Sequence, residues 1–202
     1  NTARSGGGVL ICENVTFTME NGSISGNAAT QGGGVFIDTN GTFTMEGGAI
    51  SGNNAYYYGG GVCGLESATF TMKNGSIFGN SAARSGAGMT IGSTLRLSGA
   101  PKILDGVDTI IALANTFEIV GDLTDGANIV ISSSWQDNQM QPGVTVAEKS
   151  DEYAGIITDA EAAAFTGIAV NGETLYGFAN ADGTSVVWDY ARLAGAPVID
   201  NT

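Results

Sequence analysis

Two glutamates are the first side chains in this sequence that could act in catalysis. Glu20 and Glu46 each follow a Thr-Phe-Thr-Met segment and so occupy equivalent places in two repeated segments. Two carboxylates that face outward on neighbouring strands could serve as a general acid and a general base. The equivalent position in the third segment is Lys73, which predicts a surface ion pair beside them. The pattern therefore favours a solvated row of charges over an active site.

Other catalytic or metal-binding residues are few. The chain contains no histidine, which removes the commonest general base and most transition-metal sites. Asp122 and Asp125 fall in a predicted turn, where aspartate is usually solvated. Arg96 and Glu118 occupy equivalent positions in successive segments, so they are expected to pair. We expect no catalytic residue, no metal site and no cofactor.

A second set of side chains consists of threonines in Thr-x-Thr pairs. They are Thr16, Thr18, Thr42, Thr44, Thr69 and Thr71. Stacked on parallel strands, these pairs would form a flat array spaced by about 4.8 Å between strands and about 7 Å along them. Such an array is similar to the ice-binding faces of some β-helical antifreeze proteins, but threonine is also a favoured exposed strand residue. The array is expected to stop at Arg96 and Glu118.

The third set is aromatic. Tyr56, Tyr57 and Tyr58 are consecutive in a segment that is small and polar elsewhere, and Arg84 occupies the position equivalent to Tyr57 in the next segment. We expect these tyrosines to lie in a turn, outside any strand. Exposed aromatic rings beside an arginine suit stacking against a sugar ring or a protein partner. Packing of the rings over the turn is the alternative.

All of these residues belong to an internal repeat of about 26 residues. Gly-Gly-Gly-Val begins at Gly6, Gly32 and Gly59, with Gly-Ala-Gly-Met at Gly86. Thr-Phe-Thr-Met and a Gly-x-Ile-x-Gly-Asn segment follow in each of the first three repeats. The repeat weakens after these but is expected to continue in a column of equivalent apolar residues: Phe17, Phe43, Phe70, Leu95 and Phe117.

Within each repeat, apolar residues alternate with polar ones in three short pieces, which is the period of a β-strand. One repeat cannot bury its apolar residues alone, so successive repeats must stack. The sequence therefore predicts an all-β, right-handed parallel β-helix with three strands per coil. In coil five the first strand is expected at Ile111 and Leu113. Asn27, Asn53 and Asn80 are expected to form a ladder at one corner, in left-handed backbone geometry.

The remainder of the chain differs from the repeats. We assign 1–132 to the coils, 133–190 to a small mixed cap and 191–202 to a tail or linker. Thr158 opens a predicted short helix, 158–165, with a capping box, and 175–178 and 185–188 are predicted to form a hairpin. The first coil has no such cover and begins within a repeat, which predicts further coils or another domain before it, or end-to-end association of protomers.

Composition limits the possible partners. The net charge is −13, and most of the acidic residues lie in the second half of the chain, which argues against nucleic acid and anionic membranes as partners. No stretch of 18 apolar residues is present, so we expect no membrane insertion by this segment. Cys12 and Cys63 fall two coils apart, beyond the reach of a disulfide, and are expected to be free thiols.

The motifs Gly-Gly-Gly-Val, Thr-Phe-Thr-Met and Ser-Ile-Ser-Gly-Asn resemble those of adhesin-like β-helix proteins that gut anaerobes display on their surface. The stretch 110–126 is similar to the ends of those arrays, and 47–50 is similar to an element of polymorphic outer-membrane proteins, whose companion Phe-x-x-Asn is absent. The resemblance implies an extracellular or cell-surface scaffold that binds glycan or protein. A polysaccharide-active enzyme and an ice-binding protein are the alternatives.

Overall fold

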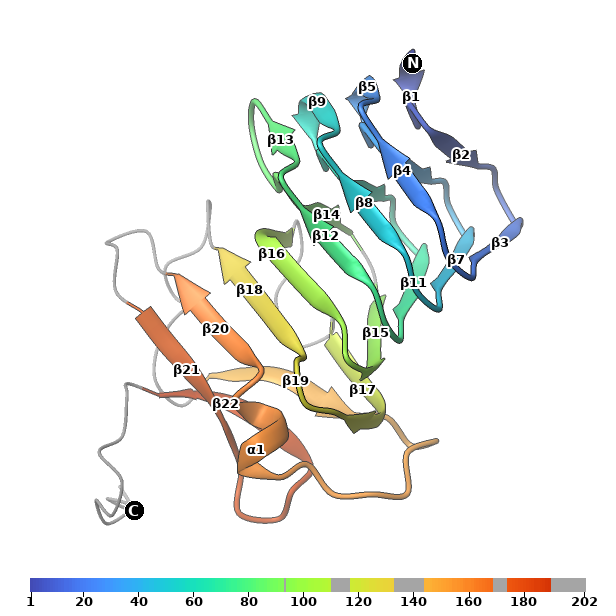
Figure 1. Ribbon diagram of the computed structural model, residues 1–202. Coiled ribbons are helices and arrows are strands. Elements are labelled where there is room, and N and C mark those ends of the chain that lie inside the picture. The colour runs from blue at the N-terminus through green and yellow to red at the C-terminus, as the bar shows by residue number, and fades with distance from the viewer. Residues whose placement is uncertain (93, 110–116, 133–143, 169–173, 190–202) are drawn as a thin grey trace.

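The computed structural model describes residues 1–92, 94–109, 117–132, 144–168 and 174–189. In this part of the chain almost all regular structure is β, and the one helix is the short α1 (Asp159–Ala162). Parallel coils of about 26 residues stack into an elongated solenoid of about five turns (Figure 1). The predicted parallel β-helix is confirmed.

Three stacks of parallel strands form the body of the solenoid, one strand of each stack from every coil. The first stack contains β2 (Val9–Ile11), β6 (Val35–Ile37), β10 (Val62–Gly64) and β14 (Met89–Ile91). The second contains β3 (Thr16–Met19), β7 (Thr42–Met45), β11 (Thr69–Met72), β15 (Thr94–Gly99) and β17 (Phe117–Leu123). The third contains β4 (Ser23–Ser25), β8 (Ala49–Ser51), β12 (Ser76–Phe78), β16 (Lys102–Thr109) and β18 (Asn128–Ser132).

The register places equivalent residues of successive coils directly over one another. The predicted column is confirmed, because each member is the strand partner of the next: Phe17, Phe43, Phe70, Leu95 and Phe117. The rings of Phe43 and Phe70 stack at 4.7 Å between centroids and 5° between planes. Stacked aromatic pairs of this kind contribute roughly 0.5–1.5 kcal/mol beyond the burial of their surface.

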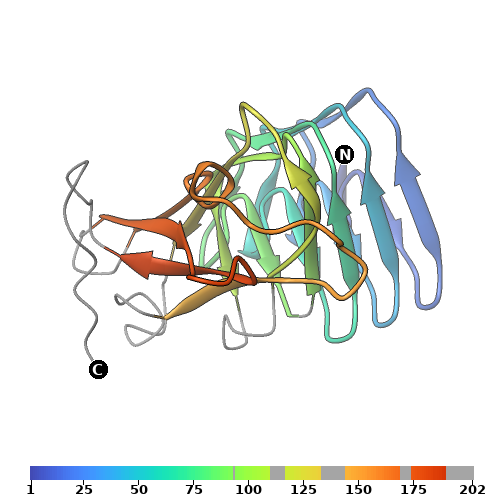
Figure 2. The same cartoon turned by 90° about the horizontal axis from the view of Figure 1, so that it is seen from below.

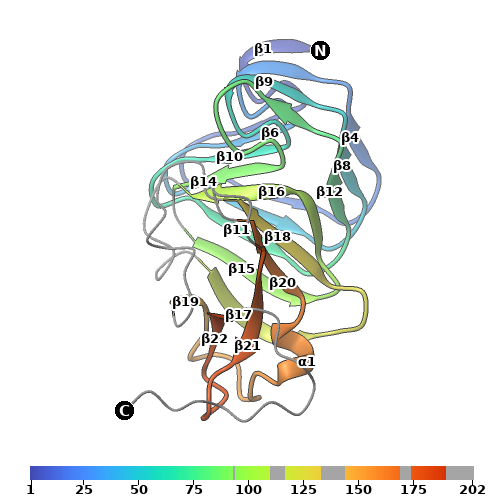
Figure 3. The same ribbon diagram turned by 90° about the vertical axis from the view of Figure 1, so that its left-hand side faces the viewer.

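A fourth short strand per coil, which the sequence pattern did not predict, forms a corner stack. It contains β1 (Thr2–Ser5), β5 (Ala28–Gln31), β9 (Asn54–Tyr58) and β13 (Ser81–Ala82). Viewed along the solenoid, the corner stack lies at one end of the cross-section, next to the first stack (Figure 3). The triple-glycine turn brings the two close together: a Cβ added at Gly59 would lie 2.7 Å from the Cβ of Cys63. Phe36 and Cys63, on the outer side of the first stack, are therefore buried as well.

The corner stack ends after the fourth coil, because β16 runs through the corner without interruption. Ile103 in its first half pairs with Ile77 of the third stack, and Val107 in its second half pairs with Met89 of the first stack. Val107 thus takes the place in coil five that the sequence pattern assigned to Ile111, so that prediction is wrong. Ile111 and Leu113 themselves lie outside the described residues.

The asparagine ladder is present at the junction of the third and corner stacks. The Oδ1 atom of Asn53 accepts hydrogen bonds from the backbone N and the Nδ2 of Asn27, at 3.0 and 3.1 Å. Asn80 accepts equivalent bonds from Asn53. The expected left-handed geometry of the asparagines is wrong, because the glycine before each one has the positive φ. Glycine adopts that conformation at lower cost, which leaves the asparagine side chain free to bond to the next coil.

The C-terminal part continues the solenoid for a further partial coil and then covers it. β19 (Thr145–Lys149) pairs in parallel with β17, and β20 (Phe165–Ile168) with β18. The predicted hairpin is confirmed as β21 (Thr174–Ala179) and β22 (Ser185–Asp189), which pair antiparallel with each other. β21 also pairs antiparallel with β20, and β22 with β19, so these two strands cross the end of the stack (Figure 2).

The capping box of α1 is confirmed, but the helix is shorter than predicted. The Thr158 side chain accepts from the backbone N of Glu161, and the Glu161 side chain accepts from the backbone N of Thr158. The helix ends at Ala162 because Phe165, expected in the helix, starts β20 and fills the column position next to Ile129. The assigned cap, 133–190, is described only in part, and the assigned tail, 191–202, lies outside the described residues.

Asp105 closes the asparagine ladder, and its removal should destabilise the fold. Its carboxylate accepts from the backbone N of Gly79 at 2.7 Å and from the backbone N and Nδ2 of Asn80 at 2.8 and 3.0 Å. Asp105→Ala should lower the free energy of unfolding by about 1–3 kcal/mol, because buried donors of Asn80 lose their acceptor. Urea denaturation followed by circular dichroism measures the change.

Two further variants make this test specific. Asp105→Asn keeps a side-chain oxygen at the position and should lose less stability than Asp105→Ala. Asp125→Ala removes an exposed carboxylate from a turn and should change the free energy of unfolding by less than about 0.5 kcal/mol. Equal stability of Asp105→Ala and the unmodified chain would contradict a structural role for the carboxylate.

Candidate functional site

The three consecutive tyrosines lie in the corner strand of the third coil. The structure places Tyr56, Tyr57 and Tyr58 within β9, so the expectation that they lie outside any strand is wrong. Tyr56 is 65% exposed, and Tyr57 and Tyr58 are half-buried. The rings form a continuous group: those of Tyr56 and Tyr57 meet edge to face at 4.7 Å, and those of Tyr57 and Tyr58 are tilted at 6.1 Å.

A β-bulge accounts for the clustering of these rings. Ala55 pairs with Ala29 of the preceding coil, whereas Tyr58 pairs with Gln31, so Tyr56 and Tyr57 together oppose the single residue Thr30. A bulge adds one residue and re-aims the side chains around it. This extra residue explains why Phe43 and Phe70 are 27 residues apart, whereas Phe17 and Phe43 are 26 apart.

Arg84 belongs to the same group, as its position in the repeat suggested. Its Cζ atom lies 4.9 Å from the centroid of the Tyr57 ring, and its backbone N donates to the Tyr57 carbonyl oxygen at 3.2 Å. A guanidinium over an aromatic face is a cation–π contact, which at an exposed site contributes about 0.5–1 kcal/mol. The group therefore combines exposed ring surface with a cation that has free N–H donors to offer a ligand.

The predicted threonine rows are formed on the outer side of the second stack. Strand pairing brings Thr16, Thr42 and Thr69 into one row and Thr18, Thr44 and Thr71 into a second. Thr16 and Thr18 are exposed, and the other four are half-buried. The first row also contains Thr94, which sequence reasoning missed because the Thr-Leu-Arg-Leu segment had lost the Thr-x-Thr pair.

The second threonine row ends at Arg96 because this residue anchors the cap. Its Nε lies 3.1 Å from an oxygen of Glu118, which confirms the predicted pair, and its Nη2 lies 2.7 Å from an oxygen of Glu152. Glu152 was missed because it lies outside the repeat, 56 residues along the chain. Tyr153 beside it donates to Asp122 at 2.6 Å, so the segment after β19 is tied to the coils at two points. Burial, together with the Asp122 carboxylate, raises the pKa of Tyr153 above its ordinary value.

The carboxylates considered for catalysis have structural or solvated environments. Lys73 pairs with Glu46 at 2.9 Å, as expected for a surface ion pair. Glu20 is exposed in the first coil, and Asp125 is exposed in the turn before β18. Among the residues that the structure describes, no group of three or more histidine, cysteine, aspartate or glutamate side chains could hold a metal ion.

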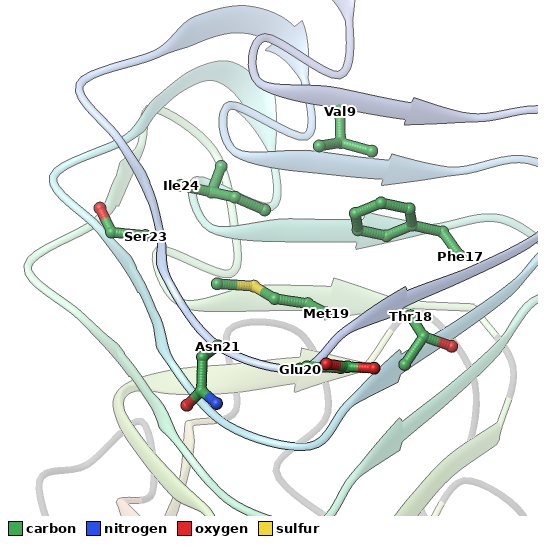
Figure 4. A pocket seen from close by; sticks show the side chains of 8 residues that line it. All are labelled: Val9, Phe17, Thr18, Met19, Glu20, Asn21, Ser23 and Ile24. Carbon is green, nitrogen blue, oxygen red and sulfur yellow. The ribbon is translucent and has the colours of Figure 1, made fainter.

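The first coil presents an open depression of about 540 Å³. It is lined by Val9, Phe17, Thr18, Met19, Glu20, Asn21, Ser23 and Ile24 (Figure 4). Val9, Phe17, Met19 and Ile24 are the first-coil members of the columns of apolar residues that fill the solenoid. The ring of Phe17 points into the depression. The depression is therefore apolar on the side of Val9, Phe17, Met19 and Ile24 and polar on the side of the other four residues.

The two cysteines should differ sharply in reactivity. Both are free thiols, Cys12 exposed and Cys63 buried beneath the corner stack. Burial raises the pKa of the Cys63 thiol to about 12, so almost no thiolate, the reactive form, is present near neutral pH. A maleimide at about pH 8 should label one thiol of the native chain and two after denaturation, as counted by mass spectrometry.

Cys12→Ser serves as the control for this labelling. The variant should take up no maleimide until it is unfolded. Two labels on the native chain would show that the corner stack does not cover the first stack as described.

Comparison with known proteins gives this chain no relatives. No family model, no curated protein and no solved structure matches it. In the described part of the chain, no helix has the length and apolar character that crossing a membrane requires. The function must therefore be argued from the surfaces of the solenoid.

Proposed function

We propose that this chain is a non-catalytic, adhesin-like β-helix scaffold of the cell surface or the extracellular space. It contacts a glycan or a protein weakly through side chains on the outside of its coils. The observation that supports this most is the group formed by Tyr56, Tyr57, Tyr58 and Arg84. A rigid stack of coils holds these rings in place, so little conformational entropy is lost when a partner binds.

The chemistry of this group suits a sugar ring or a planar protein side chain. The exposed face of Tyr56 offers apolar surface for the C–H groups of a sugar, and the phenolic oxygens can exchange hydrogen bonds with its hydroxyls. Arg84 adds donors that fit a carboxylate, so acidic sugars and acidic peptides should be preferred over basic ones. One such corner gives only a small contact area, which is the reason for expecting weak binding.

Tyr57→Ala should weaken binding on an array of glycans and mucins. The substitution removes the ring that contacts both Tyr56 and Arg84, so it disrupts the whole group. A loss of about tenfold in affinity corresponds to about 1.4 kcal/mol, within the range of one interfacial aromatic residue. Titration of a ligand identified on the array, followed by NMR, measures the loss.

Ile156→Ala is the matched control, because Ile156 is 64% exposed, much as Tyr56 is, and lies in the segment before α1, outside the corner stack. It should leave glycan and mucin binding unchanged. If Tyr57→Ala leaves every detected interaction intact, the tyrosine corner is not a binding site.

Ice binding is the second candidate function, and the register of the threonine rows favours it. Seven threonines lie in two straight rows on one side of the second stack: Thr16, Thr18, Thr42, Thr44, Thr69, Thr71 and Thr94. The hydroxyl and methyl groups of such rows repeat at a spacing set by the parallel strands, about 4.8 Å. Against this, Glu46 and Lys73 flank the rows and hold strongly hydrated charges near them.

Ice binding is tested by thermal hysteresis. If the threonine rows bind ice, the chain should lower the freezing point below the melting point, and Thr44→Tyr at the centre of the rows should abolish the gap. Ser25→Tyr places the same side chain on a different stack as a control. No hysteresis from the unmodified chain would remove this candidate.

A further inference from the structure

One row of outward-facing residues changes character as it crosses the third stack. In the first two coils the row consists of Ser25 and Ser51, which are strand partners. From the third coil onward it is mainly apolar and contains Phe78, Leu104, Val130, Thr166 and Tyr176. These five residues, here called the apolar row, lie on the adjacent strands β12, β16, β18, β20 and β21, on the side facing the viewer in Figure 1.

Three large side chains of the apolar row are exposed to solvent. Phe78 is 43% exposed, Leu104 46% and Tyr176 40%, and Val130 between them is half-buried. Neighbouring members are separated by about 4.8 Å, so their exposed surfaces merge into one strip. Contiguous apolar strips on a folded protein mark places where another surface docks.

The charge distribution favours a second copy of this chain as the partner. The net charge of −13 makes most approaches between two copies repulsive. The outward positions of the second stack include Glu20, Glu46 and Glu118. On the third stack, by contrast, the outward rows that contain Ser23 and Ser25 include no carboxylate among the described residues of β4, β8, β12, β16 and β18, and Lys102 is their one charged side chain. Asp105, which follows Leu104 on β16, is half-buried, and its carboxylate accepts hydrogen bonds from Gly79 and Asn80 at the asparagine ladder. Two copies can therefore meet at these rows without bringing unpaired carboxylates together.

The chemistry of the strip also points to protein rather than sugar. Leu104 and Val130 at its centre have neither a ring to stack on a sugar nor a hydrogen-bonding group for its hydroxyls. They suit the side chains of another sheet, since two sheets pack face to face at about 10 Å when both faces are apolar. Face-to-face packing would bury the outer face of these five strands and not the row alone. At about 4.8 Å per strand and about 17 Å of strand length, that face is on the order of 400 Å² per copy, at the low end of interface sizes, where contacts are weak and reversible.

We propose that the apolar row is a self-association surface, at which two copies of this chain pack face to face through their third stacks. The contact is isologous, with the same row used by both copies, so it closes at a dimer. It leaves the tyrosine corner of each copy outside the contact, because that group lies on the separate corner stack. A dimer would thus present two corners at once, which strengthens weak binding to a repetitive partner.

Sedimentation velocity over a range of about 10 μM to about 1 mM tests the proposal. The unmodified chain should show an average mass that rises with concentration from monomer towards dimer. The double variant Phe78→Ser and Leu104→Ser gives both coils the serine found at Ser25 and Ser51, so it suits the fold. It should raise the dimer dissociation constant by at least about tenfold. Ser51→Phe, which lengthens the row by one coil, should lower that constant.

Two controls separate this surface from the others. Tyr56→Ser removes a more exposed ring from the corner stack, and Phe17→Ser alters the open end of the first coil; neither should change the dissociation constant. A monomer at every concentration overturns the proposal, even if the double variant reduces binding of an apolar dye, because the row would then serve a different partner. Dimerisation that survives the double variant, or that Phe17→Ser abolishes, also overturns it.

Discussion

The whole molecule depends on one constraint, which is that each coil must be extended by a coil of nearly equal length. Backbone hydrogen bonds between parallel strands fix the register, and the register places Phe over Phe, Ile over Ile and Asn over Asn. No single coil can bury its own apolar residues, so burial, aromatic stacking and the asparagine ladder all arise only between coils. The triple-glycine turns follow from the same constraint: a Cβ at Gly33 would lie 2.5 Å from the carbonyl oxygens of Asn54 and Gly60, so no larger residue fits between coils.

Where the repeat is regular, the sequence predicts the structure well, and where it decays the prediction fails for physical reasons. The Phe column and the hairpin are confirmed because alternation and turn residues are local signals. The corner stack was not predicted, since Ala-Ala-Thr-Gln and Asn-Ala-Tyr-Tyr-Tyr have no apolar alternation and pair only because the neighbouring stacks bring them together. Val107 was missed in coil five because β16 runs through the corner as one continuous strand. The triple glycine that marks the corner in the earlier coils is therefore absent from this part of the sequence.

The candidate site was predictable in its residues but not in its geometry. The three tyrosines are conspicuous in the sequence, and the equivalence of Arg84 with Tyr57 follows from the repeat. Only the structure shows that a bulge brings the rings together and that the arginine lies over one of them. The link from Arg96 to Glu152 could not be predicted either, because it joins a coil to a segment outside the repeat. Departures from the repeat at Tyr56 and Phe78 thus carry the proposed binding surfaces, and the departure at Arg96 attaches the cap.

The outer surface of a solenoid can change while its core stays the same. Regular coils are interchangeable, so their outer residues can vary without cost to the columns inside, and the row of Ser25 and Ser51 becomes Phe78 and Leu104 with the inner Ile column unchanged. An apolar substitution outside gives the coil that bears it only part of the stability of full burial, because Phe78 stays 43% exposed and Leu104 46% exposed. The surface that stays exposed on these adjacent strands is the part available to the self-contact proposed above. On a chain of net charge −13, outward rows that carry no carboxylate are the place where such a contact meets the least electrostatic opposition from a second copy.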